Sequence, residues 1–184
     1  MRFHFDEMKA AQAAAHLISS HGDRINATVL IKLLYLADRS ALIENGQPIT
    51  GDRMVAMPHG PGLCMILDLM NVGGGSPGSI WSMTVSPPEN FEVSLRRDPG
   101  KDRLSANEIG LLDRINDAFG HLEWREICQI ARGLPEVRNA DGALLIIAPE
   151  DILSAEGRSA EEIERITRDA EELWFVDELR KLAS

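Results

Sequence analysis

Apolar residues recur at every third or fourth position along most of this chain, a spacing that predicts amphipathic helices. The first two runs follow Asp6 and Asn26, whose side chains are typical caps of helix N-termini. Gly22 and Gly46 mark where these helices should end. The second run is apolar on most of its circumference, so we expect helix 27–45 to be central and buried.

Later segments repeat the helical spacing, and two of them start with the Ser-x-x-Glu pattern of a capping box. Gly60-Pro61 also has the pattern of a helix start, because proline is tolerated at the first helical position. The further helices that we expect begin near Pro61, Ser105, Glu123, Pro149 and Ser159, and the last of them runs toward Leu182. The helix over 123–132 should bury its apolar residues, which are Trp124, Ile127, Cys128 and Ala131.

Three shorter segments, 53–57, 80–85 and 91–95, have the composition of β-strands. Turn residues are frequent between the last two, so we expect 80–85 and 91–95 to form a β-hairpin. Strands and helices do not alternate as they would in a doubly wound sheet. The sequence therefore predicts an α+β fold that is mainly α: a compact helical domain with a small antiparallel β element and a C-terminal amphipathic helix.

Charge and cysteine content limit the partners that the protein can have. The 184 residues include 19 Lys and Arg against 29 Asp and Glu, a formal net charge of -10. Such a surface repels phosphate, so nucleic-acid binding by this chain alone is disfavoured, although a local basic patch could lie at 96–103. Cys64 and Cys128 occupy apolar helical positions and should be reduced and buried. Without a secretory signal or an apolar run of membrane-spanning length, we expect a cytoplasmic protein without membrane contact.

Motifs of catalytic sites occur in this chain outside the structural context that they need. The loop 73–78 matches the dinucleotide fingerprint and, at Ser76, the nucleophile elbow. Both patterns require a strand before the loop and a helix after it, and here the expected order is reversed. His59, in a turn, could contact a ligand, but a solvated or capping role is favoured. We expect no enzyme, no catalytic residue, no metal and no cofactor; a small hydrolase using His59 or Ser76 is the least favoured alternative.

Polar side chains interrupt the apolar helix 27–45 along one strip. Lys32, Tyr35 and Arg39 lie at positions i, i+3 and i+7, and Asp38 follows Tyr35 by three residues. Three interpretations remain open for this strip. It can be a solvated edge, an anchor for the turn that follows, or part of a partner-binding surface, for which Arg and Tyr are typical residues.

The last helix carries a second candidate surface. Ile163, Ile166, Ala170 and Leu173 form one apolar stripe, and 174–176, with the sequence Trp-Phe-Val, widens it. The helix either packs on the core of its own chain or serves as a partner-binding or dimerising arm. The second interpretation rests on the aromatic cluster, because large aromatic residues often anchor interfaces.

Three motifs follow one another in a fixed order at the centre of the chain. They are Lys32-Leu33-Leu34-Tyr35-Leu36-Ala37-Asp38, Gly46-Gln47-Pro48-Ile49 and Ala56-Met57-Pro58-His59-Gly60-Pro61. In this order and spacing the chain resembles the SocA-like Panacea domain, which phage-associated GepA-like proteins share. The resemblance covers roughly Met8 to Ile147. The chain departs from the family pattern at 131–132, where members often have Thr-His, and at 135–137, where they often have Pro-x-Trp.

The resemblance implies an antitoxin, which neutralises a cognate toxin by direct binding, and it implies neither enzyme activity nor a cofactor. It suggests a Panacea-like antitoxin domain over 1–147 and a C-terminal helical extension over 148–184, packed on the domain or on a partner. The alternative function is a proteolytic adaptor that delivers the toxin to a protease. Besides the toxin, a second copy of the chain is a candidate partner.

We expect the partner to contact the polar strip, the turns that follow it and the last helix. The candidate partner-binding residues are Lys32, Tyr35, Asp38, Arg39, Pro48, His59, Trp174 and Phe175. An acidic antitoxin suits a basic toxin, since opposite charges speed the association of two proteins.

Overall fold

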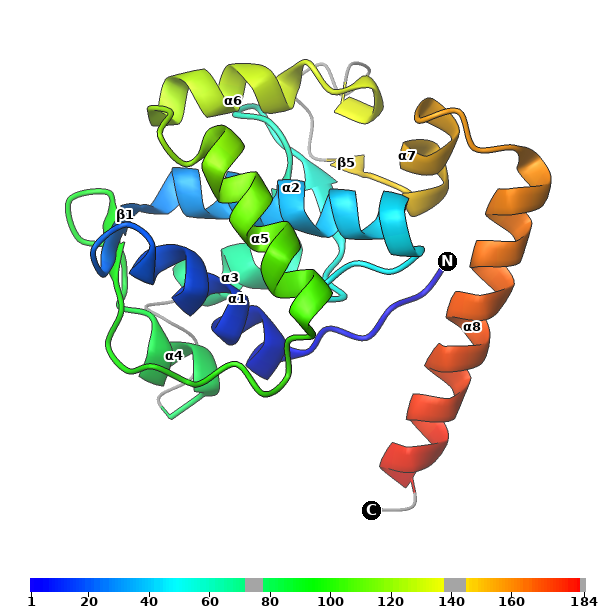
Figure 1. Ribbon diagram of the computed structural model, residues 1–184, viewed down its shortest axis with the longest axis horizontal. Helices are drawn as coiled ribbons and strands as arrows, with labels where there is room; N and C mark the ends of the chain where they lie inside the picture. Colours follow the sequence, from blue (N-terminus) through cyan, green and yellow to red (C-terminus); the bar gives the residue numbers. More distant parts are fainter. Residues whose placement is uncertain (72–77, 138–144, 183–184) are drawn as a thin grey trace.

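One long helix, α2 (Ala27–Asn45), crosses the middle of the molecule, and the other elements surround it (Figure 1). Its bounds agree with those predicted from its caps. The Asn26 side chain accepts hydrogen bonds from the N–H groups of Thr28 and Val29, at 2.9 and 3.3 Å, and Gly46 ends the helix with a φ of 75°. The structure is a computed structural model that describes residues 1–71, 78–137 and 145–182.

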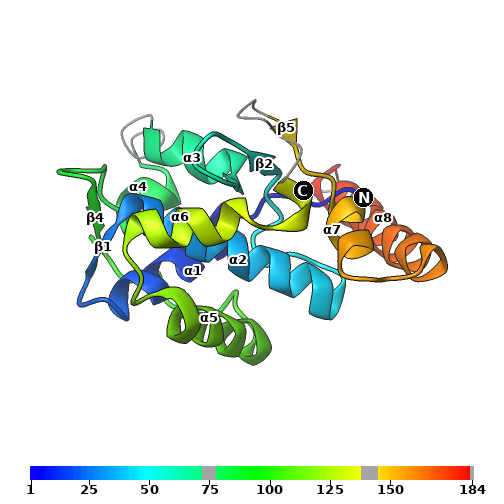
Figure 2. The same ribbon diagram turned by 90° about the horizontal axis from the view of Figure 1, so that it is seen from above.

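Among the helices that pack directly against α2 are α1 (Glu7–Ser19), α5 (Ala106–Phe119) and α6 (Trp124–Arg132). The buried face of α1 consists mostly of alanines, which let the two helix backbones approach closely. The predicted capping box of α5, between Ser105 and Glu108, is confirmed. Seen from above, α5 and the elements around β2 (Met54–Ala56) lie on opposite sides of α2 (Figure 2), so α2 is covered on both sides.

Two small antiparallel sheets complete the fold and confirm the predicted β element. β1 (Arg24–Asn26) pairs with β4 (Glu92–Ser94), with Ile25 opposite Val93. In the second sheet β2 lies between β3 (Gly62–Leu63) and β5 (Leu145–Ile146). The fold is therefore α+β and mainly α, as the sequence predicts.

The predicted strand at 80–85 is wrong: this segment forms the short helix α4 (Ile80–Thr84). The Ser79 side chain caps it by accepting the N–H of Ser82, and the Trp81 side chain is buried. The backbone N–H of Trp81 donates to the carboxylate of Glu7 on α1, at 2.9 Å, so a contact distant in sequence fixes the helix. The expected hairpin is reduced to two isolated bridges, Val85 with Leu95 and Glu89 with Glu92.

The helix expected to start at Pro61 begins later, as α3 (Cys64–Asn71), because β3 comes first. Its first turn is capped from a distance. The Asp52 carboxylate accepts the N–H groups of Met65 and Ile66, at 3.0 and 2.9 Å. This tertiary cap, which no local pattern announces, places the helix start three residues beyond the proline. Cys64 is only half-buried as a result, whereas Cys128 is buried as expected, and both thiols are free.

The C-terminal part of the described chain consists of the 3-10 helix η1 (Pro135–Val137), α7 (Pro149–Ala155) and α8 (Ala160–Leu182). α7 packs against α2 and η1, and α8 contacts α7 and then runs along one side of the molecule, beside the N-terminal segment (Figure 1). The division into a domain of 1–147 and an extension of 148–184 stays a prediction. None of the helices in the described stretches is long and apolar enough to cross a bilayer.

Candidate functional site

The polar strip of α2 lies inside the molecule. Lys32, Tyr35, Asp38 and Arg39 are all buried, so the interpretation of the strip as a solvated edge is wrong. A buried polar group has to find hydrogen-bond partners within the protein. Each of the four side chains does so with a segment outside α2, and the strip connects this helix to three separate parts of the surface.

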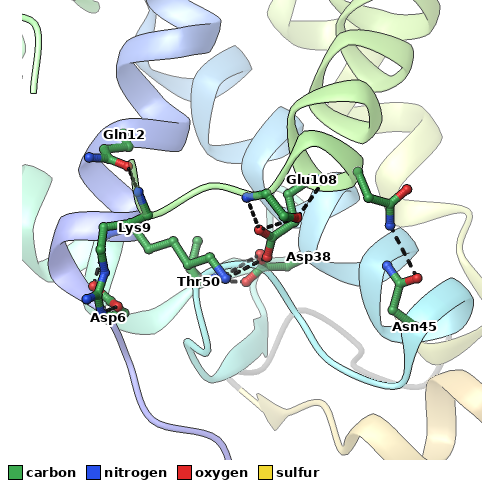
Figure 3. A network of polar contacts seen from close by, with 10 residues as sticks. Asp6, Lys9, Gln12, Asp38, Asn45, Thr50 and Glu108 are labelled. Carbon is green, nitrogen blue, oxygen red and sulfur yellow. Dashed lines mark hydrogen bonds and ion pairs between the residues drawn. The ribbon is translucent and has the colours of Figure 1, made fainter. Parts of the chain in front are cut away.

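Asp38 anchors the turn that follows α2, which was one of the predicted roles of the strip. Its carboxylate accepts the backbone N–H of Thr50 at 3.0 Å and the Thr50 hydroxyl at 2.5 Å (Figure 3). Complete burial raises the pKa of Asp38 to about 7, against the opposing effect of these hydrogen bonds. The Thr50 carbonyl in turn accepts the N–H of Asp6, at 2.9 Å. Asp38 thereby fixes both the turn that carries Pro48 and the start of α1.

Lys32 anchors the second turn, which carries His59. Its ammonium group donates to the carbonyl oxygen of Pro61 at 2.6 Å. Burial lowers the pKa of Lys32 to about 8, because the charged form loses its hydration. Gly60 in this turn has a φ of 91°, and a side chain there would come within 3.2 Å of Arg132. The turn is therefore packed tightly between α2 and α6.

Tyr35 and Arg39 connect α2 to the C-terminal elements through a buried carboxylate. Arg39 contacts Glu136 of η1 with two nitrogens, at 2.7 and 3.2 Å, and Glu156 beyond α7 at 2.6 Å. The Tyr35 hydroxyl donates to the same Glu136 at 2.9 Å. Burial raises the pKa of Glu136, but the hydrogen bonds from Arg39 and Tyr35 outweigh it and hold this pKa below its ordinary value. Glu136 thus stays ionised inside the protein.

A second polar network holds α1 against α5, next to the Asp38 anchor (Figure 3). Lys9 forms an ion pair with Glu108 at 2.6 Å, and the Gln12 side chain donates to Asp102 at 2.6 Å. The Asp6 carboxylate accepts a hydrogen bond from Arg103, also at 2.6 Å. These contacts fix the base from which the N-terminal segment reaches α8.

Pro48 and Trp174, which are far apart in sequence, line one cavity of about 200 Å³. The N-terminal segment lies between their elements. The rings of His4 and Trp174 are stacked with 5.2 Å between centroids, and the Arg2 guanidinium lies 5.4 Å from the Trp174 ring. Trp174 therefore docks α8 on its own chain. The structure brings these two candidate residues together at the side of the molecule where α8 lies.

Phe175 lies about 140° around α8 from the buried Ala170. With Leu179 and Leu182, four and three residues further on, it forms an apolar stripe whose members are each at least 50% exposed. Val176, also exposed, lies beside this stripe, whereas Leu173 lines the cavity of Trp174 on the other side of the helix. The C-terminal half of α8 is thus apolar on the face that points away from the body, which is the arrangement of a helix that docks into a groove of another protein.

His59 lies at the other end of the molecule, in a different environment. With Asn26, Thr28, Phe91 and Trp124 it lines a hollow on the surface. The prediction that Trp124 is buried is wrong, since it is 41% exposed, and Phe91 was not among the candidates. The turn-rich segment before Phe91 was the only signal in the sequence. Ser76, the other residue of the hydrolase alternative, lies outside the described residues.

The eight candidate residues thus fall into three groups: four form an internal frame on α2, Pro48 and Trp174 line a cavity beneath α8 with Phe175 on its outer face, and His59 lines a separate hollow with Phe91 and Trp124. Whether they contact a partner stays a prediction. Within residues 1–71, 78–137 and 145–182, no three His, Cys, Asp or Glu side chains are grouped so that they could hold a metal ion.

Comparison with known proteins gives a consistent result. No curated protein and no solved structure matches the chain. Among protein families, the one described as "Antitoxin SocA-like, Panacea domain" matches residues 30–135, more than half of the chain. The match includes α2 with its polar strip, both anchored turns, α5 and α6, and it ends beside Glu136. The chain therefore belongs to the SocA-like antitoxin family, and the frame described above is part of its Panacea domain.

Proposed function

We propose that this protein is an antitoxin that neutralises a cognate toxin by direct protein–protein contact and catalyses no reaction itself. The observation that carries the proposal is membership of the SocA-like antitoxin family over residues 30–135. Covering the active site of a toxin requires a complementary surface of sufficient area, and it requires no catalytic groups on the antitoxin.

The outer face of α8 supports this proposal and is the surface that we assign to the toxin first. An exposed stripe of Phe175, Leu179 and Leu182 is costly in water, and burial in a partner removes that cost. Eight acidic residues lie along α8 against four basic ones: Glu161, Glu162, Glu164, Asp169, Glu171, Glu172, Asp177 and Glu178 against Arg165, Arg168, Arg180 and Lys181. This balance, together with the net charge of -10, suits a toxin with a basic surface and disfavours pairing with a second acidic copy.

The four buried residues of α2 act indirectly in this proposal. They hold the turns and η1 in place, and we expect their loss to reduce the amount of folded antitoxin. Trp174 and Pro48 position α8 on the body, so they determine where its outer face points.

Co-expression with the product of the neighbouring reading frame tests the proposal. We expect that product to arrest growth alone, and this protein to restore growth and to form a stable complex that survives size-exclusion chromatography. Rescue of growth in the co-expressing cells, combined with no complex between the two purified proteins, would contradict the proposal. Measuring the half-life of the toxin with and without the antitoxin separates masking, in which the half-life does not fall, from delivery to a protease.

The surface is tested by Phe175→Asp and Leu179→Asp, each placing a charge in the apolar stripe. Both should abolish rescue while leaving the unfolding midpoint unchanged, because neither side chain is packed in the core. Met83→Asp on α4 is the matched control, since Met83 is 45% exposed and lies on a different part of the molecule (Figure 1). If both α8 variants restore growth as well as Met83→Asp does, α8 is not part of the interface.

A further inference from the structure

The turn just before β4 has a backbone conformation that its sequence makes unfavourable. Glu89 and Glu92 exchange backbone hydrogen bonds of 2.8 and 3.0 Å around Asn90 and Phe91. These two residues have φ angles of 52° and 66°, as in a type I′ turn. Asparagine tolerates this region, but the second position normally takes glycine, because a side chain there is strained. The chain nevertheless has phenylalanine, with 82% of it exposed.

Hydrogen bonds on both sides of the turn fix the backbone that carries Phe91. The Phe91 carbonyl accepts the N–H of Ala27, the first residue of α2, at 2.8 Å, and β4 pairs with β1 just before that helix. Trp124 is the first residue of α6, where a capping box between Glu123 and Glu126 fixes the helix start. Trp124 thus belongs to a helix that packs against α2, and Phe91 belongs to a turn that is hydrogen-bonded to the first residue of α2.

The two aromatic residues, with His59, Asn26 and Thr28, enclose a hollow of about 280 Å³ that we call the aromatic hollow. Its members come from four segments far apart in sequence. The frame described above keeps it open, since Lys32 and Gly60 fix the turn of His59 against α2 and α6. This volume accommodates one large apolar side chain.

Charges beside the aromatic hollow are mainly negative. Glu89 and Glu92 close the turn around Phe91, and Glu123 and Glu126 stand in the first turn of α6 with Trp124. Three guanidinium groups accompany these four carboxylates: Arg24 is paired with Glu92, Arg125 lies 5.1 Å from the Trp124 ring, and Arg132 packs against Gly60 in the turn of His59. The surplus of carboxylates favours a partner that carries lysine or arginine next to its apolar side chain.

We propose that the aromatic hollow is a second contact site for the toxin, which inserts one large apolar side chain flanked by Lys or Arg. This inference rests on the proposed function and adds a surface at the opposite end of the molecule from α8. Phe91 and Trp124 are the anchors, because exposed aromatic residues held rigidly lose little freedom on binding. A second copy of the chain is a poor occupant, since it brings the same carboxylates to the contact.

The experiment compares Phe91→Gly with the wild type, using the toxin encoded beside this protein as the probe. Glycine relieves the strained turn, so the variant should unfold at an equal or higher urea concentration, and a loss of binding cannot come from misfolding. We expect Phe91→Gly and Trp124→Ala each to weaken the complex about 30-fold in calorimetric titration. The double variant Glu89→Gln/Glu123→Gln should associate with the toxin more slowly than the wild type. The difference should be larger at low salt, where the charges are less screened.

Met83→Ala serves as the control for removal of an exposed apolar side chain elsewhere, and it should bind like the wild type. Binding of both Phe91→Gly and Trp124→Ala within twofold of the wild type would overturn this inference and leave the proposed function intact. A wild-type protein that does not bind the toxin at all would overturn both. If the protein alone is a dimer in light scattering and Phe91→Gly makes it a monomer, the aromatic hollow is a contact between copies and the inference is wrong.

Discussion

The buried ion pair between Arg39 and Glu136 gives the sharpest test of how α2 supports the surface. The Glu136 side chain is fully buried and that of Arg39 is 10% exposed, and two hydrogen bonds of 2.7 and 3.2 Å join them. In Arg39→Met the long apolar stem is kept but the charge is lost. Glu136 then remains in the interior without its cationic partner, while the Tyr35 hydroxyl still donates to it.

The expected cost of Arg39→Met is about 3–5 kcal/mol of unfolding free energy, the usual penalty for leaving one partner of a buried ion pair uncompensated. That is a large part of the about 5–15 kcal/mol by which such domains are stable. Adding Glu136→Gln removes the stranded charge, and the amide oxygen still accepts from Tyr35. We therefore expect the double variant to lose at least about 2 kcal/mol less unfolding free energy than the sum of the losses in the two single variants.

Urea unfolding followed by tryptophan fluorescence measures all four species of this cycle. The control is Arg114→Met, which breaks an ion pair with Glu44 whose side chains are 56% and 45% exposed, and it should cost at most about 1 kcal/mol. The reasoning would be refuted if Arg39→Met were no more destabilising than Arg114→Met. It would also fail if the costs of Arg39→Met and Glu136→Gln added without coupling.

Three further predictions follow from single positions. Burial raises the pKa of Asp38 to about 7, so between about pH 4 and 7 the folded chain keeps a proton that the unfolded chain has lost. The unfolding free energy should therefore fall by up to about 1.4 kcal/mol per pH unit as the pH rises through this range. Asp38→Asn should remove this slope when urea unfolding is measured at several pH values. Gly51→Ala should destabilise the protein more than Gly22→Ala in the same assay, because both glycines have φ near 70° but only a side chain at 51 overlaps the backbone oxygen of His4; equal losses would contradict this. Ser105→Ala should lower the unfolding free energy by about 1 kcal/mol through loss of the α5 cap, and an unchanged midpoint would contradict the capping role.

Elements whose ends are fixed by neighbouring residues could be predicted well from the sequence. Helix α2 begins after Asn26 and ends before Gly46 as expected, because both caps act within the same turn of chain. α4 could not be predicted, since its helix depends on the burial of Trp81 and on the carboxylate of Glu7, 74 residues away. The start of α3 depends in the same way on Asp52.

The sequence identified several residues of the candidate site, but it did not predict which of them are buried or what they contact. The strip of Lys32, Tyr35, Asp38 and Arg39 was found because helical spacing aligns its residues, but its burial depends on partners that periodicity does not identify. Trp124 has an apolar helical position whether or not anything covers it, so its exposure could not be derived from spacing. Tertiary neighbours decided both outcomes.

Under the proposed function, the arrangement of these residues separates two kinds of effect on toxin neutralisation. The strip of α2 lies behind the turns of Pro48 and His59 and behind η1, so changes in it alter how much protein is folded and how the surface is shaped. The stripe of α8 and the aromatic hollow lie outside, so we expect changes there to alter affinity at constant stability. Rescue that fails together with a lowered unfolding free energy therefore indicates the frame. Rescue that fails at unchanged stability indicates the contact surface, and because the two surfaces lie at opposite ends, their effects on affinity should add if one toxin molecule covers both.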